Sequence, residues 1–236
     1  MTIPENGPEI STESASPGEN GKRRNVSGDN TRILLIETAE RLFAERGIDA
    51  VSLREIRLAA GQSNSSVVTY HFGSKVGLIQ AILDYRRNDI KRDRDAMIEQ
   101  MRADGTESDA RALIWLHVRP LVNSLRSGSR FVPFLDRLSE ERHARTRFGL
   151  NEVSTPYGYA AMEELWDAFL GDIPERVKRI RTYQTYLGIQ HLLAEVGRTR
   201  DDFTEAQLCV FVDGWVGMLS APVSEETNAA LSLPAD

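Results

Sequence analysis

A short stretch between two helical patterns carries the side chains most suited to chemistry. It reads GQSNSSVVTYHFGSK and spans residues 61–75. Its hydroxyl, phenol and imidazole groups belong to Ser65, Ser66, Thr69, Tyr70 and His71. Such groups hydrogen-bond to phosphate oxygens and to the edges of bases. Few of these side chains suit a core, so the stretch predicts an exposed surface that binds a polar partner.

Metal chemistry has one candidate, the pair Glu140 and His143, which are spaced as in one half of a di-iron helix bundle. That chemistry requires a second Glu-x-x-His pair, and the sequence contains none. Cys209 is the only cysteine, so disulfides within the chain and zinc sites built on several cysteines are excluded. No nucleophile elbow or phosphate loop is present either. We therefore predict no metal site, no cofactor and no enzymatic activity.

Two helices should precede the polar stretch and position it. The segment TRILLIETAERLFAERGI, residues 31–48, has apolar residues at steps of three and four, which predicts one buried helical stripe. Its apolar positions are Leu35, Ile36, Ala39, Leu42 and Phe43. Gly47 follows as a left-handed cap. Ser52 and Glu55 form a capping-box pattern, which predicts the start of a second, short helix.

The polar stretch itself should hold a third helix. Val68 and Phe72 are four residues apart and can anchor one face, while Asn64 is placed to cap the N-terminus. Gly61 breaks the preceding helix. The remaining side chains then point outward: Ser65, Ser66, Thr69 and Tyr70. A short helix, a glycine turn and a helix with a polar outer face form a helix-turn-helix pattern, whose second helix enters the major groove of DNA.

Over roughly residues 31–85 the sequence resembles a TetR-family transcriptional regulator. The resemblance rests on AERLFAERGIDAVSLREI, the AAG turn, YHF and GSKVGL, in that family's order. The gap from Gly61 to Phe72 is one residue longer than usual, which leaves open whether Ser63 or Asn64 is the cap. The resemblance implies DNA contacts by Ser65, Ser66, Thr69, Tyr70 and His71. It also implies a phosphate contact by Lys75 at the start of a fourth helix, where a helix N-terminus attracts anions.

The whole chain is predicted to be all-α, with no alternating strand pattern. We expect a disordered tail over 1–28, a helix-turn-helix DNA-binding domain over 29–85, a helical ligand-binding and dimerisation domain over 86–222, and a flexible tail over 223–236. The first tail ends in the basic run 22–24, which is either simply solvated or an arm laid along DNA.

The resemblance implies a ligand pocket between the middle helices. Aromatic and apolar residues that could line it are Trp115, Phe131, Phe134, Met162 and Trp166, although each can equally be ordinary core. The last two long helices, near 174–198 and 203–221, are apolar on more than one side, which predicts a homodimer interface. The expected function is repression at operator DNA, relieved by a small apolar effector.

Charge and hydropathy are compatible with this expectation. The net charge is −6, so the chain as a whole is not a basic nucleic-acid coat. Residues 31–90 carry eight basic and seven acidic side chains, which makes this segment the least acidic and favours an anionic partner there. No apolar run of membrane-spanning length and no signal-peptide pattern are found, so we expect a cytoplasmic protein with no membrane partner.

Overall fold

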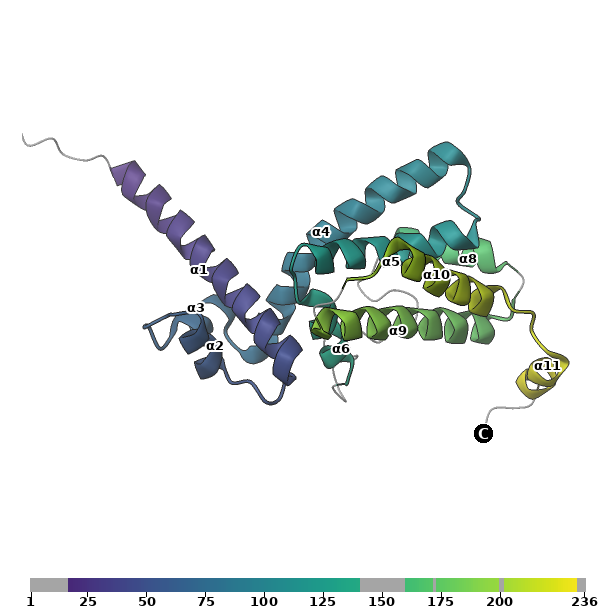
Figure 1. Ribbon diagram of the computed structural model, residues 1–236. Coiled ribbons are helices and arrows are strands. Elements are labelled where there is room, and N and C mark those ends of the chain that lie inside the picture. Colours follow the sequence, from purple (N-terminus) through teal and green to yellow (C-terminus); the bar gives the residue numbers. More distant parts are fainter. Residues whose placement is uncertain (1–16, 141–159, 172, 200–201, 233–236) are drawn as a thin grey trace, which may run out of the picture.

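The structure, a computed structural model, describes residues 17–140, 160–171, 173–199 and 202–232. Within these ranges it contains helices and no strand, which confirms the all-α prediction. The helices are α1 (Pro17–Arg46), α2 (Leu53–Ala59), α3 (Val67–Phe72), α4 (Lys75–Asp104), α5 (Ala110–Arg126), α6 (Phe131–Glu140), α8 (Ala160–Leu170), α9 (Glu175–Thr199), α10 (Glu205–Ser220) and α11 (Glu225–Leu231). In Figure 1, α1–α3 form one end, and α4 runs from them into a body of α5, α6, α8, α9 and α10.

The N-terminal domain forms as its apolar pattern predicts. The stripe of α1 is buried, and α1 ends where the amide of Gly47, at φ +85°, donates to the carbonyl of Phe43. α2 starts with the predicted capping box: the Glu55 amide donates to Ser52 Oγ at 3.2 Å, and the Ser52 amide donates to the Glu55 carboxylate at 2.8 Å. These caps satisfy backbone donors that a helix leaves unpaired at its start.

Both predicted tails contain helix that composition did not predict. α1 begins at Pro17, although residues 17–28 were expected to be disordered. Proline favours the first helical position, and a helix nucleated by packing gains one hydrogen bond for each residue added. α11 lies within the predicted C-terminal tail and starts where Ser224 Oγ accepts from the Thr227 amide at 3.1 Å. Residues 1–16 and 233–236 lie outside the described residues.

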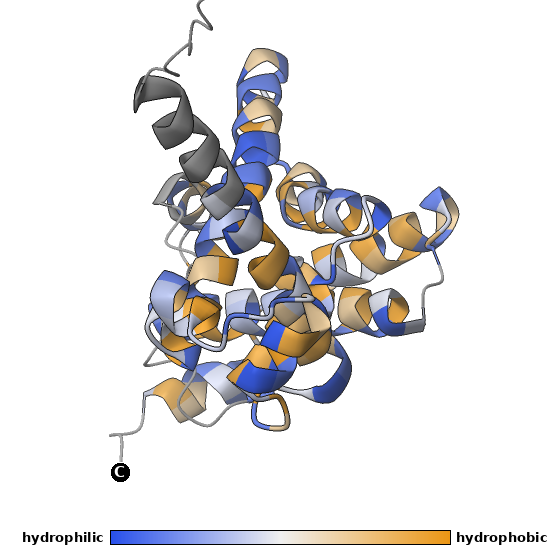
Figure 2. Cartoon of the chain, turned by 90° about the vertical axis from the view of Figure 1, so that its left-hand side faces the viewer, coloured by the Kyte–Doolittle hydropathy of each residue, from blue (hydrophilic) through white to orange (hydrophobic). Residues whose placement is uncertain are grey.

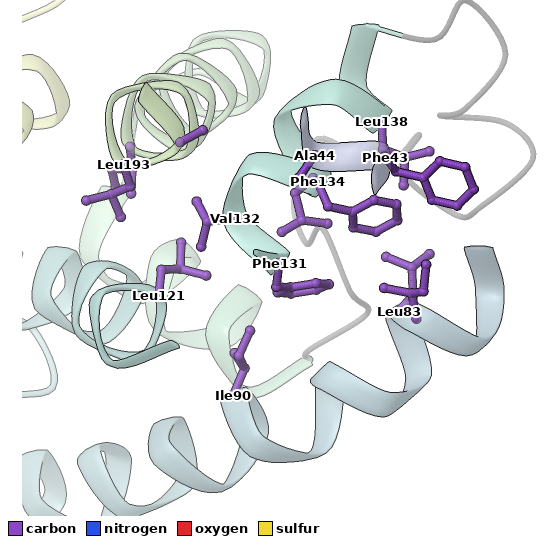
Figure 3. Close-up of a cluster of buried hydrophobic side chains, with 14 of the residues drawn as sticks. Phe43, Ala44, Leu83, Ile90, Leu121, Phe131, Val132, Phe134, Leu138 and Leu193 are labelled. Atoms are coloured by element: carbon purple, nitrogen blue, oxygen red, sulfur yellow. The ribbon is translucent and has the colours of Figure 1, made fainter. Parts of the chain in front are cut away.

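A joint of packed aromatic residues connects the two domains. α6 packs against α9 and α1, and Figure 3 shows Phe134 of α6 beside Phe43 of α1, with Leu83 of α4 near them. The Phe43 and Phe134 ring centroids are 6.2 Å apart, and the Phe131 and Phe134 centroids are also 6.2 Å apart. All three rings are fully buried. A movement of α6 must therefore displace α1, the helix that contributes Phe43 to the core of the N-terminal domain.

A buried carboxylate reinforces the same joint. Glu40 of α1 is 2 % exposed. It accepts from Arg86 Nε of α4 at 2.6 Å, from Ser129 Oγ at 3.0 Å and from the Arg130 amide at 2.8 Å. Ser129 and Arg130 lie in the turn between α5 and α6. A buried charge held by several donors fixes the geometry of its neighbours, because any displacement leaves it unpaired.

The helices of the body are amphipathic and pack through their apolar faces. In Figure 2 they carry both hydrophobic and hydrophilic stretches, as helices with one buried side do. α9 and α10 correspond closely to the last two helices predicted from sequence.

No single helix in the described ranges has the length and apolar character to cross a membrane, whereas the bent pair of α10 and α11 meets those two criteria together.

Candidate nucleic-acid interface

The outer face of α3 is polar and accessible. Val67 and Val68 are 8 % and 3 % exposed and fix its inner face. The four side chains predicted to point outward are all exposed: Ser65, Ser66, Thr69 and Tyr70. Tyr70 is 82 % exposed, an extreme value for so large a side chain. An aromatic side chain left in water with its hydroxyl outermost is suited to a contact with a partner.

The two remaining predicted contacts are half-buried. The His71 ring lies edge-on to the Tyr70 ring, with centroids 5.1 Å apart. Lys75 stands at the first position of α4, but its Nζ lies 5.6 Å from the centroid of the Phe43 ring. Its ammonium group therefore lies against the core in this structure. Lysine has a flexible stem, so a phosphate near the start of α4 can draw the charge outward.

The turn before α3 is held by hydrogen bonds. Gly61 has φ +66°, and Arg57 Nη1 donates to the carbonyls of Gln62 at 2.6 Å and Ser63 at 3.1 Å. Asn64 Oδ1 accepts from the Ser66 amide at 3.0 Å and from Ser66 Oγ at 2.9 Å. The prediction that Ser63 or Asn64 caps α3 is wrong, because neither occupies the N-cap position; the Asn64 side chain instead closes the turn before the helix. Ser66 occupies the N-cap position but makes no side-chain capping bond of its own.

At the junction of α3 and α4, one position has no space for a side chain. Gly73 has φ +70°, and Ser74 Oγ caps α4 by accepting from the Gly77 amide at 3.1 Å. A Cβ added at Gly77 would lie 2.0 Å from the Phe72 carbonyl oxygen. Only glycine allows the two backbones to approach so closely. The relative placement of α3 and α4 is therefore set by residue 77.

Three arginines that sequence reasoning passed over support this surface. Arg57 holds the turn, and the Arg32 guanidinium lies 5.4 Å from the Phe72 ring centroid. Arg46 pairs with Glu55 at 2.8 Å. The Ser52 backbone amide, and then Arg46 and the Ser52 hydroxyl, lower the pKa of Glu55 to about 2. Local sequence gave no signal for the Arg32 contact, because its partner lies forty positions away.

The five predicted pocket residues lie in the C-terminal half and at the joint. Phe131, Phe134, Met162 and Trp166 are buried, and Trp115 is half-buried with the Arg119 guanidinium 4.3 Å from its ring centroid. Phe131 and Phe134 serve the joint between the domains. A pocket of about 570 Å³ lies elsewhere, at the ends of α5 and α9, and none of the five lines it. Its lining includes Leu125, Arg126, Arg130, Gly197 and Phe203.

The metal alternative gains no support from the described residues. His143 lies outside them, and Glu140 interacts with Arg137 at 3.3 Å. Among the residues that the structure describes, no three His, Cys, Asp or Glu side chains are grouped to hold a metal ion.

Comparisons with known proteins point to the same domain. Residues 35–82 match the family model of the bacterial regulatory proteins of the tetR family. Over 63 residues the chain is 36 % identical to two proteins of Pseudomonas putida, the HTH-type transcriptional regulator TtgR and the probable HTH-type transcriptional regulator ArpR. Each match covers 27 % of this chain and 30 % of the relative, so it spans less than a third of either protein.

A solved structure shares the architecture beyond that domain. The crystal structure of a gamma-butyrolactone receptor (ArpA like protein) superposes with a TM-score of 0.50 at 18 % identity, covering 82 % of this chain and 96 % of the other. At this identity the likeness shows the fold. The family model, the two relatives and the helix-turn-helix geometry agree over the N-terminal part of the chain, where residues 35–82 are similar to the bacterial regulatory proteins of the tetR family.

Proposed function

We propose that the chain is a sequence-specific DNA-binding regulator that represses transcription from its operator. The observation that carries the proposal is the exposed polar face of α3, held between a hydrogen-bonded turn and a glycine-tight junction with α4. A surface of fixed shape on the second helix of a helix-turn-helix unit suits the major groove. The relatives matched over this domain are named as transcriptional regulators, which supports the same role.

Within this proposal the exposed side chains divide by role. Ser65, Ser66 and Thr69 lie at the N-terminal side of α3 and its turn, where they can reach base edges. Tyr70, His71 and Lys75 contact phosphates, which position the protein without reading sequence. Lys75 acts after its ammonium group leaves the Phe43 ring for the DNA backbone.

We propose that the protein acts as a homodimer in the cytoplasm, joined through α9 and α10. Both helices keep large apolar side chains in water: Ile180 is 49 % exposed and Val210 is 66 % exposed. A partner copy would bury them, and this stabilises association. A dimer would present two α3 helices to half-sites about 34–36 Å apart, one helical turn of DNA, or a multiple of that spacing.

A small, largely apolar effector bound in the helical body would release the DNA. α4 supports this route, because it packs on both α3 and α5, and Asp93 in its second half accepts from Asn123 Nδ2 of α5 at 3.1 Å. The joint at Glu40 would carry movement of α6 to α1. A coupling free energy of about 1–3 kcal/mol between the two sites changes operator affinity about 5–150-fold.

The test is fluorescence anisotropy with duplexes tiled across the DNA next to the protein's own gene. We expect one duplex to bind at least about a thousandfold more tightly than a shuffled duplex of equal composition. Sedimentation of the same protein should give a dimer at micromolar concentration. Equal affinity for every duplex, or a wild-type monomer, would contradict the proposal.

A further inference from the structure

The core of the C-terminal domain buries polar groups that have no hydrogen-bond partner. His117 of α5 is 5 % exposed, and neither of its ring nitrogens is hydrogen-bonded. Thr185 of α9 is 1 % exposed, and its Oγ1 also lacks a partner. Buried polar groups are nearly always paired, because leaving one unpaired costs about 1–3 kcal/mol. Two such residues on facing helices therefore need an explanation.

α9 places Tyr186, the residue next to Thr185, against His117 of α5. The Tyr186 ring stands edge-on to the His117 ring, with centroids 4.8 Å apart and planes at 86°. Thr185 directly precedes Tyr186 on α9. Burial, and then the positive charge of Arg94, lower the pKa of His117 well below its ordinary value. The imidazole is therefore neutral, and it presents one N–H donor and one lone pair.

The surroundings restrict what could bind there. One helical turn further along, Leu121 on α5 and Ile189 on α9 are almost fully and fully buried, so the unpaired groups lie in an apolar part of each helix. No group of three metal-binding side chains exists among the described residues, so these nitrogens do not belong to a recognisable metal site. A neutral imidazole and a hydroxyl suit oxygen atoms that accept or donate one hydrogen bond each.

We propose that His117 and Thr185 bind the oxygen-bearing head of the effector, a hydroxyl, carbonyl or carboxyl group on an otherwise apolar small molecule. This inference rests on the proposed function, in which an effector releases DNA, and it states the chemistry of that effector. Entry of the molecule separates α5 from α9. Because α4 packs on α5, the separation also displaces α4, whose start borders the DNA-binding helix.

The first experiment needs no effector. Thr185→Val and His117→Phe replace unpaired polar groups by apolar groups of similar size, so both variants of the full chain should melt at higher temperature than the wild type. Ser129→Ala is the control, because the Ser129 hydroxyl is buried and hydrogen-bonded to Glu40, and its loss should lower the melting temperature. Melting of both variants below the wild type would show that the groups are paired in solution, by buried water for example, and would overturn the proposal.

The second experiment measures binding to the full chain without DNA by calorimetry. The probes are 2-naphthol, 2-acetonaphthone and 2-naphthoic acid, compared with naphthalene, which lacks a polar head. At least one headed probe should bind about tenfold more tightly than naphthalene, and His117→Phe or Thr185→Val should remove most of that difference. Equal binding of naphthalene, unchanged binding to the variants, or no binding of any headed probe would overturn the inference. Because operator binding is measured separately, its failure would contradict the proposed function and leave this result standing.

Discussion

Two buried polar centres in this protein are built in opposite ways. Glu40, at the joint between the domains, is 2 % exposed and accepts hydrogen bonds from Arg86, Ser129 and the Arg130 amide. His117, in the C-terminal core, is 5 % exposed and its ring nitrogens accept and donate none. Burial is nearly equal, so burial alone does not determine how polar groups are satisfied.

The difference indicates different roles for the two regions. A fully paired carboxylate stabilises one arrangement of three segments, because each donor loses its partner when any segment moves. An unpaired imidazole and hydroxyl raise the free energy of the folded state. A ligand that hydrogen-bonds to them removes this cost, which stabilises the complex. The joint is therefore suited to transmit movement, and the core of the C-terminal domain is suited to receive a ligand.

The largest effect that tests this comparison is expected at the joint. Glu40→Ala leaves the half-buried Arg86 guanidinium without its carboxylate and the Ser129 hydroxyl and Arg130 amide without their acceptor, so we expect the free energy of unfolding to fall by about 3–5 kcal/mol. Urea unfolding of the purified protein measures it. Glu45→Ala is the matched control, because Glu45 is on the same helix in an exposed pair with Arg41 at 3.5 Å. That variant should lose only about 0–1 kcal/mol. Equal losses in the two variants would remove Glu40 from the joint.

The next largest effect is expected at the junction of α3 and α4. Gly77→Ala places a Cβ 2.0 Å from the Phe72 carbonyl oxygen, so the two helices must move apart. We expect a loss of about 1–3 kcal/mol of stability, together with loss of specific operator binding in anisotropy. Gly28→Ala is the control, since nothing lies within 4 Å of a Cβ there. In helix α1 it should stabilise by about 0.5–1 kcal/mol. Operator binding by Gly77→Ala equal to the wild type would show that α3 tolerates the shift.

The same contrast separates what sequence could predict from what it could not. The stripe of α1, the capping box of Ser52 and Glu55 and the start of α4 near Lys75 depend on neighbours a few residues apart, and all were predicted. The contact of Arg32 with Phe72 and the pairing of Glu40 with Ser129 join residues far apart in the chain. Periodicity and capping rules carry no information about such pairs.

The candidate sites show the same limit. Exposure of Ser65, Ser66, Thr69 and Tyr70 followed from the anchoring of Val68 and Phe72 on the opposite face. The pocket prediction selected aromatic residues, of which Phe131 and Phe134 pack in the joint between the domains. Large apolar side chains have the same sequence signature in a core and in a pocket. His117 and Thr185 could not be selected from sequence, because their lack of partners is a property of the folded core.

A smaller effect is expected on the salt dependence of DNA binding when Lys75 is replaced. Lys75→Ala should weaken binding of every duplex alike and reduce the slope of log affinity against log salt by about 0.9, the contribution of one phosphate contact. Lys91→Ala makes the same charge change in an exposed pair with Asp95, further along α4. The slope of that variant should equal the wild-type slope. An unchanged slope for Lys75→Ala would mean that the ammonium group stays against Phe43 when DNA is bound.

The smallest effect concerns Glu55, an exposed carboxylate that contrasts with Glu40. The Ser52 amide, then Arg46 and the Ser52 hydroxyl, lower its pKa from 4.5 to about 2. A carboxyl with a lowered folded-state pKa contributes stability that is fully present above its unfolded pKa and is lost as pH falls toward the folded value. This contribution should therefore disappear between about pH 4.5 and 2.

Glu55→Gln isolates that contribution, because glutamine can keep the capping hydrogen bond but does not titrate. The melting temperature of the wild type should exceed that of Glu55→Gln above about pH 5, and the difference should narrow as the pH falls toward about 2. The exposure of Glu55 keeps the effect small, since solvent screens its pairing with Arg46. A constant difference between the wild type and Glu55→Gln across this range would show that the carboxylate is no better paired in the folded state than in the unfolded chain.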